Sequence, residues 1–243
     1  MDENVLAALP ARLVPWFAAA KRDLPWRRDR EPYHVWVSEI MLQQTRVEAV
    51  VGYYDRFLKA LPDIRALADA PEDQLMKLWE GLGYYSRARN LQKAARQIME
   101  RHGGTFPRDA ADIRALAGIG DYTAGAIGSI CFEYPTAAVD GNVLRVVSRV
   151  TGSDAPIDKP ETKKKIGVDR SAVYPAGHCG DFTQSLMELG ATVCTPRGAR
   201  CGVCPLADIC AAKREDRVDA LPVKGEKRAR KIEERTVFFL EYE

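Results

Sequence analysis

Four of the six cysteines lie in one short segment near the end of the chain, and this group constrains the fold more than any other feature. They are Cys194, Cys201, Cys204 and Cys210, separated in turn by six, two and five residues. Four thiolates on one compact loop can hold a [4Fe–4S] cluster or a structural zinc ion, and the loop must then fold around that group. Zinc sites usually place two short cysteine pairs far apart or include histidine, so the three unequal gaps favour the cluster.

The composition is that of a folded globular protein, and it excludes a disordered or collagen-like chain. Hydrophobic residues make up 46% and charged residues 29% of the 243 residues, a length that suits one or two domains. No run of about 18 apolar residues occurs, so we expect no membrane span. Acidic residues precede the first arginine, so we expect no secretory signal and a cytoplasmic location. The net charge of +2 neither requires nor excludes a nucleic-acid partner.

Apolar residues at helical spacing, with breakers at regular intervals, predict an almost entirely α-helical chain. We expect helices over residues 5–20, 35–42, 45–60 (with Thr45 as the N-cap), 70–81, 84–102, 124–131, 140–150 and 181–193. Residues 152–179 contain several prolines and are predicted to be irregular. Residues 236–242 read as a β-strand with no second strand to pair with, which suggests that a following domain is missing.

The segment LAGIGDYTAGAI, residues 116–127, has the form of a helix–hairpin–helix. Gly118 and Gly120 would allow a sharp turn and a close approach of the backbone to a ligand. The amides at the start of the following helix would then point at an anion, and phosphate is the natural partner. A GxG turn alone is weak evidence. The small-residue helix behind it and the sequence VDGN after it make the pattern much stronger.

Basic residues surround the cysteine loop, at Arg197, Arg200, Lys213, Arg214 and Arg217. A basic loop held by a cluster suits a phosphate backbone better than it suits electron transfer. The alternative interpretation is an ordinary solvated charged face.

The order of these features resembles that of the helix–hairpin–helix DNA glycosylases that carry an iron–sulfur cluster, and more narrowly the MutY-type adenine DNA glycosylases. The matching segments are LPWR (24–27), PYHVWVSEIMLQQTRV (32–47), GLGYYSRARNL (81–91), LAGIGDYTAGAI (116–127), VDGNVLRV (139–146), DFTQSLMELGATVC (181–194) and the cysteine loop. The resemblance spans about residues 5 to 217.

The resemblance implies an all-α fold in two parts. Residues 27–134 would form a six-helix barrel that contains the hairpin, while residues 1–26 and 135–217 would form the domain that carries the cluster. Residues 218–243 would be a linker and the first strand of a missing C-terminal Nudix-like domain. The implied activity is hydrolytic removal of adenine mispaired with 8-oxoguanine or guanine in double-stranded DNA. We expect a monomer associated with the nucleoid and with no membrane.

The resemblance also assigns catalytic roles. Glu39 matches the general acid that protonates adenine, and its apolar neighbours would raise its pKa. Asp140 matches the carboxylate that stabilises the cationic sugar, although by itself it reads as a helix N-cap. Tyr122 stands where the related endonuclease III-type enzymes carry a catalytic lysine, which predicts a glycosylase without strand cleavage. Asn142 would orient Asp140 or the attacking water.

Further matches concern the substrate. Gln44 would enter the base stack near the lesion, Tyr84 would wedge beside 8-oxoguanine, and Gln184 would offer its amide to the adenine edge. Arg27 and Trp26 would line the base pocket. For Tyr84 and Trp26 the alternative is core packing.

Three other functions compete with this hypothesis. A thymine mismatch glycosylase of the same fold can also carry tyrosine in the hairpin, but the segment SEIMLQQT favours adenine. An endonuclease III-type lyase is disfavoured by Tyr122. A non-enzymatic iron–sulfur DNA-binding or redox protein would have no need for Glu39, Asp140 and Tyr122 together.

Overall fold

The computed structural model describes residues 3–225, 233–234, 236–238 and 241, and every regular element in this part of the chain is a helix. The predicted all-α class is confirmed. The α-helices are α1 (Glu3–Ala7), α2 (Leu9–Ala20), α3 (Pro32–Met41), α4 (Val47–Ala60), α5 (Ile64–Asp69), α6 (Glu72–Trp79), α7 (Ser86–His102), α8 (Ala110–Ala115), α9 (Asp121–Phe132), α10 (Gly141–Thr151), α11 (Pro160–Ser171), α12 (Cys179–Thr192) and α13 (Ala211–Arg214). Two 3-10 turns, η1 (Pro25–Arg27) and η2 (Cys201–Val203), complete the list.

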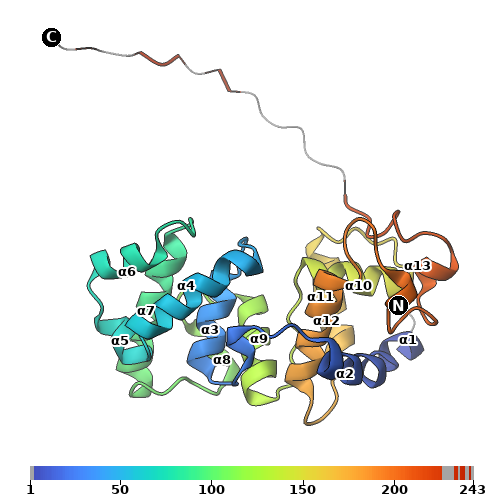
Figure 1. The fold of residues 1–243 in the computed structure, drawn as a ribbon, viewed down its shortest axis with the longest axis horizontal. Helices are drawn as coiled ribbons and strands as arrows, with labels where there is room; N and C mark the ends of the chain where they lie inside the picture. Colours follow the sequence, from blue (N-terminus) through green and yellow to red (C-terminus); the bar gives the residue numbers. More distant parts are fainter. Residues whose placement is uncertain (1–2, 226–232, 235, 239–240, 242–243) are drawn as a thin grey trace.

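The helices form two lobes that lie side by side (Figure 1). The first lobe contains α3 to α9 around a core that includes Trp36, Phe57 and Trp79. The second contains α1, α2 and α10 to α13 around a core that includes Leu13 and Phe182. The N-terminal helices thus pack with the second half of the chain, and the chain enters the first lobe at Leu24 and η1. The precise domain limits stay a prediction.

Helix α9 is the wall that the two lobes share, because it packs against α3 on one side and α12 on the other. Its small residues allow this close packing. A Cβ atom on Gly125 would lie 2.4 Å from the carbonyl oxygen of Ala137, and one on Gly180 of α12 would lie 2.9 Å from the Cα of Ile130. The small residues of α9 therefore allow the segment around Ala137 and helix α12 to pack closely against it. This packing brings the two lobes together at α9.

Several helices begin where an aspartate can cap them, as helix N-termini require. Asp63 caps α5, Asp109 caps α8 and Asp140 caps α10, and each side chain accepts a hydrogen bond from a backbone amide of the first turn. Helix α7 ends at Gly103, whose φ of 60° is the left-handed conformation that glycine adopts without strain. The interpretation of Asp140 as a helix N-cap is therefore correct. The same residue also lines a pocket between the lobes.

The prediction of an irregular segment over residues 152–179 was wrong, because this segment contains α11. The helix was missed because its sequence is mostly polar and buries little apart from Thr162 and Ile166. Its proline, Pro160, occupies the first helical position, where a missing N–H costs nothing. In this segment Pro160 marks the start of α11 and does not break a helix.

Two smaller predictions also need correction. Thr45 does not cap α4: Arg46 occupies the cap position, and the Thr45 hydroxyl donates to the carbonyl of Gln43. Residues 236–238 of the predicted strand are described and form no regular element, while most of the remaining positions of that strand lie outside the described residues. No helix in the described part of the chain is long and apolar enough to cross a membrane.

Candidate active site

A pocket of about 210 Å³ lies between the two lobes and gathers most of the predicted catalytic and substrate-binding residues. Its walls come from η1, α3, α9, the start of α10, and α12. Of the predicted residues it contains Trp26, Arg27, Glu39, Tyr122, Asp140, Asn142 and Gln184. Residues as far apart in sequence as Trp26 and Gln184 therefore meet in one cavity large enough for a small planar molecule.

Glu39 lies on α3 with only 6% of its surface exposed, among apolar neighbours. Its Oε2 atom is buried and has no hydrogen-bond partner among the described residues. Burial raises the pKa of Glu39 to about 7, and the nearby negative charge of Asp140 adds to the rise, whereas the Tyr122 hydroxyl and Arg27 oppose it. A carboxyl group in this setting can hold a proton near neutral pH and donate it.

Asp140 faces the same pocket but has a different environment. Its Oδ1 accepts a hydrogen bond of 2.7 Å from the backbone amide of Val143, and its Oδ2 accepts one of 2.8 Å from the side-chain amide of Asn142. Both oxygens therefore act as acceptors, as suits a carboxylate. The two acids of the pocket thus differ: the setting of Glu39 suits a proton donor, whereas that of Asp140 suits a negatively charged carboxylate.

Tyr122 lies in the first turn of α9 and lines the same pocket as the two carboxyl groups. Burial raises the pKa of Tyr122 well above its usual value, and the charges of Glu39 and Asp140 raise it further. The phenol therefore stays protonated. Its hydroxyl lies 4.0 Å from the sulfur of Met187, and it interacts with the Glu39 carboxyl group. A permanently protonated phenol can donate hydrogen bonds here but cannot act as a nucleophile.

Asn142 connects Asp140 to a buried arginine that the sequence analysis did not select. The guanidinium of Arg145 donates from Nη2 to the side-chain oxygen of Asn142 at 2.8 Å, and to the carbonyl of Gly190 at 2.8 Å. Its Nε donates to the carbonyl of Cys194 at 2.8 Å. Arg145 therefore fixes the orientation of the Asn142 amide, and it joins the pocket to the start of the cysteine loop.

A buried ion pair closes the other side of the pocket. Glu188 on α12 is fully buried and accepts charge-assisted hydrogen bonds from Arg22 at 2.8 Å through both of its oxygens. Arg27 donates to the same carboxylate at 2.9 Å. Burial raises the pKa of Glu188, but the hydrogen bonds from Arg22 and Arg27 and the charge of Arg27 outweigh it and lower the pKa to about 2. Arg27 therefore lines this pocket, and its charge is directed at Glu188.

We expect Glu188→Gln to lower the free energy of unfolding by about 3 kcal/mol, because two arginines would be left around an uncharged group in a buried place. Stability should also fall as the pH drops below about 4, since the depressed pKa of Glu188 stabilises the fold only while the carboxylate is ionised. Urea unfolding measures both effects. The control is Asp208→Asn, which removes an exposed ion pair with Arg12 and should cost less than about 1 kcal/mol. Equal losses of unfolding free energy in the two variants would contradict a stabilising role for the buried ion pair of Glu188.

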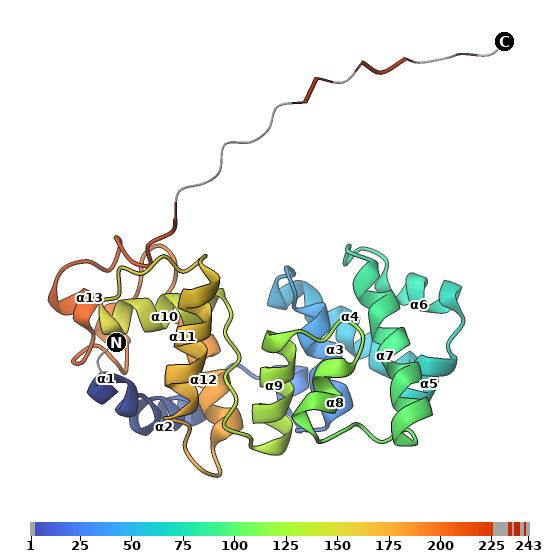
Figure 2. The same ribbon diagram turned by 180° about the vertical axis from the view of Figure 1, so that it is seen from behind.

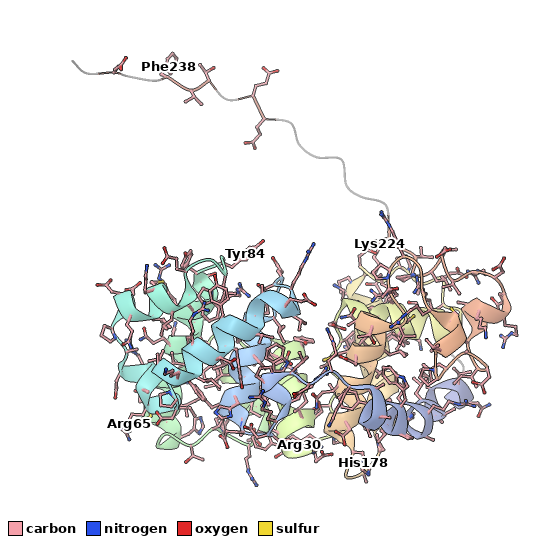
Figure 3. All side chains as sticks on the ribbon, in the orientation of Figure 1. Arg30, Arg65, Tyr84, His178, Lys224 and Phe238 are labelled. Atoms are coloured by element: carbon pink, nitrogen blue, oxygen red, sulfur yellow. The ribbon has the colours of Figure 1, made fainter. Side chains whose placement is uncertain are left out.

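Gln44 and Tyr84 lie outside the pocket, on exposed loops. Both have positive φ angles, 58° and 47°, which is uncommon for residues other than glycine. Tyr84 is 63% exposed, so the core-packing alternative is wrong for it, whereas Trp26 is buried against Tyr54. Figure 3 shows Tyr84 on the long edge of the molecule opposite to Arg30 and His178.

The two loops that carry Gln44 and Tyr84 are tied together by Arg87, which the sequence analysis did not select. One guanidinium nitrogen of Arg87 donates to the carbonyls of Ile40 and Met41, and the other donates to those of Leu82 and Gly83. The guanidinium also lies over the Tyr84 ring at 5.6 Å. This arginine therefore fixes two strained loops in place.

The hairpin between α8 and α9 has the predicted turn. Gly118 has a φ of 77°, and a Cβ atom there would lie 2.8 Å from the Cβ of Asn90, so only glycine fits. Gly120 is the N-cap residue of α9. The amides that follow it are at the positive end of a helix, as a phosphate site requires.

The four cysteines of the loop line one small pocket together with Arg149 and Lys213. Arg149 donates to the sulfur of Cys194 at 3.4 Å and to the carbonyl of Thr195 at 2.7 Å. Within the described residues, no group of three or more histidine, cysteine or acidic side chains converges as a single metal ion would need. Four thiols around one space, with cations beside them, fit the donor set and the negative charge of a thiolate-bound iron–sulfur cluster.

Comparison with known proteins assigns the family. The model of the HhH-GPD superfamily of base excision DNA repair proteins matches residues 37–168, which include Glu39, the hairpin and Asp140. The chain belongs to this superfamily. An adenine DNA glycosylase of Homo sapiens is 44% identical to this HhH-GPD protein over 234 residues, which cover 92% of the chain and 43% of the human protein. The chain thus spans less than half the length of that relative.

Two solved structures resemble this HhH-GPD protein closely. A thermostable thymine-DNA glycosylase is 28% identical, with a TM-score of 0.79, over 87% of this chain and 98% of the other. An endonuclease III–DNA complex has a TM-score of 0.74 over 89% of this chain and 98% of the other. At 20% identity, the second likeness shows the fold alone.

The residues that sequence reasoning missed in this HhH-GPD protein are all charged: Arg22, Arg87, Arg145 and Glu188. Three of them stand inside segments that carried the resemblance, namely GLGYYSRARNL, VDGNVLRV and DFTQSLMELGATVC. A charged residue is most often exposed, so none of the four was selected as a site residue from the sequence. Arg145 and Glu188 could have been identified from the sequence, because each lies among apolar residues of its helix.

Proposed function

We propose that this chain is a glycosylase that flips adenine out of duplex DNA and removes it by hydrolysis, acting on adenine mispaired with 8-oxoguanine or guanine. The observation that carries the proposal is the pair of carboxyl groups in one pocket: Glu39, buried with a pKa near 7, and Asp140, which accepts two hydrogen bonds. Cleavage of a glycosidic bond uses two carboxyl groups with different roles. The adenine-specific name of the 44% identical relative supports adenine as the base.

In the proposed mechanism Glu39 protonates a ring nitrogen of adenine, which makes the base a neutral leaving group. The bond between the base and C1′ of the sugar breaks, and the electron pair of that bond stays with the base. The sugar then carries positive charge, which the Asp140 carboxylate stabilises. Water supplies the oxygen that bonds to C1′, and its released proton goes to a carboxylate of the pocket. The products are free adenine and an abasic site.

Tyr122 and Asn142 position these groups. The Tyr122 phenol, which stays protonated, donates toward the carboxyl groups and offers no amine that could attack the sugar. The Asn142 amide, held by Arg145, orients Asp140. We therefore propose a glycosylase without strand-cleaving activity.

Substrate selection requires that the target nucleotide leave the base stack. Tyr84 and Gln44 stand on rigid, exposed loops and can fill the space that the flipped base vacates. Gln184 lines the pocket and carries an amide that can pair with the adenine edge. The hairpin amides around Gly118 and Gly120 would bind a phosphate without regard to sequence. We propose that the protein binds double-stranded DNA as a monomer.

We also propose that Cys194, Cys201, Cys204 and Cys210 hold a [4Fe–4S] cluster. When bound, it would supply a rigid, charged anchor for the basic loop. We expect about four iron atoms and four sulfide ions per chain, measured by elemental and sulfide analysis. Cys201→Ser should lose most of the iron, whereas the matched control Cys131→Ser, on α9 and outside the loop, should keep it. A single zinc ion per chain, or equal iron in both variants, would contradict the assignment.

A thymine mismatch glycosylase is the second candidate, because a structure named as a thymine-DNA glycosylase is 28% identical over nearly its full length. The two candidates are separated by the base that is released. Duplexes with adenine opposite 8-oxoguanine, adenine opposite guanine and thymine opposite guanine are incubated with excess protein, and the free base is identified by mass spectrometry. We expect adenine from the first two. Release of thymine alone would replace the proposal by its competitor.

A further inference from the structure

A second concave surface lies beside the active-site pocket and plays no part in the proposed chemistry. It is a groove of about 880 Å³ between the hairpin helices α8 and α9 on one side and α11 on the other. Residues 134–139, which follow α9, form its floor, and Figure 2 shows this segment running between α9 and α11. Tyr122 lines both the groove and the active-site pocket, so the two spaces share a wall.

Helix α11 presents one continuous stripe to this groove. The residues that line it are Pro160, Lys163, Lys164, Gly167, Val168 and Ser171. Their spacing of three and four residues is that of a single helix face. The opposite face of the helix buries Ile166 and Thr162. The orientation of α11 is therefore fixed by its buried face, and the stripe is directed into the groove.

The charge along the groove is positive. Its charged lining residues are Arg114, Lys163, Lys164 and Asp121. Asp121 forms an ion pair with Arg114 across the hairpin, so these two charges offset each other. Lys163 and Lys164 are exposed and form no ion pair with another described residue. Below them the stripe continues with Gly167 and Ser171, whose small side chains leave room for a ligand backbone.

We infer that this groove binds the phosphate backbone of DNA next to the flipped nucleotide, with Lys163 and Lys164 contacting phosphates. Tyr122 lines both spaces, so a strand whose nucleotide occupies the active-site pocket can continue along the adjacent groove. The first turn of α9, which lines the groove, and the α11 lysines then hold the backbone from opposite sides. These contacts add affinity and no base preference. The inference rests on the proposed function in one respect, which is that the substrate is DNA.

The test measures the affinity of the whole protein for undamaged duplex DNA between 50 and 200 mM salt by fluorescence anisotropy. Each lost phosphate contact lowers the slope of log affinity against log salt by about 0.9. The double variant Lys163→Ala, Lys164→Ala should therefore have a slope smaller by about 2, and an affinity lower on the order of 30-fold at 0.15 M salt. The control is Lys165→Ala, which removes one lysine from the same helix outside the stripe. Its slope should stay that of the wild type.

An unchanged slope in the double variant, or an equal change in the Lys165→Ala control, would overturn the groove assignment. Circular dichroism of each variant confirms that α11 has not unfolded. The outcome is separable from that of the proposed function. Wild-type protein that binds duplex DNA through these lysines but releases no adenine would leave the groove assignment standing. Adenine release combined with an unchanged slope would overturn the groove assignment alone.

Discussion

Glu39→Gln is expected to slow single-turnover release of adenine by about 10²–10⁴-fold, the usual contribution of general acid catalysis. Glutamine has the same size and hydrogen-bonding reach, but it has no proton to give to the base. The rate of the wild type should fall as the pH rises above about 7, because burial raises the pKa of Glu39 to about 7 and only the protonated form can act. In the variant this fall should disappear.

The controls separate chemistry from folding. Glu100→Gln makes the same change at an exposed position of α7 and should leave the rate unaltered. A buried carboxyl group whose pKa is raised costs stability once it must ionise, so Glu39→Gln should unfold at the same or a higher urea concentration at pH 8. A Glu39→Gln variant that keeps the wild-type rate and pH profile would remove Glu39 from the mechanism.

Asp140→Asn is the other change with a large expected effect, about 10²–10³-fold on the same rate. Asparagine caps a helix as well as aspartate does, so the start of α10 should survive. The variant loses the negative charge that stabilises the sugar cation, together with the hydrogen bond that Oδ2 accepts from the Asn142 amide. Binding of undamaged duplex should therefore stay close to that of the wild type while base release falls.

The structure provides a matched control for this variant. Asp109 caps α8 through the same kind of side-chain hydrogen bonds, to the amides of Ala111 and Asp112, and is not a lining residue of the pocket. Asp109→Asn should leave the rate unchanged. If the two variants lose activity equally, the role of Asp140 is capping alone.

Much of this architecture could be predicted from local sequence. Three features are short sequence patterns, and each has a single structural explanation. They are the small-residue helix α9, the glycine turn at Gly118 and the aspartate before α10. The same reasoning failed for α11, whose stability comes from packing a few residues rather than from an amphipathic pattern.

Long-range ion pairs could not be predicted for another reason. Arg22 and Glu188 are 166 positions apart in the chain, and neither carries a local signal that points to the other. The choice between a wedge and a core residue for Tyr84 also depended on the folded chain, which shows its exposure and its positive φ angle. Its role as a wedge stays a prediction.

The most direct test of the central claim is a single-turnover assay on a duplex with adenine opposite 8-oxoguanine, analysed with and without alkali. The account predicts that the wild type produces strand breaks only after alkali treatment, because it leaves an intact abasic site, and that Glu39→Gln and Asp140→Asn lose nearly all of this product. Strand breaks without alkali, or no adenine release by protein that carries its full iron content, would contradict it.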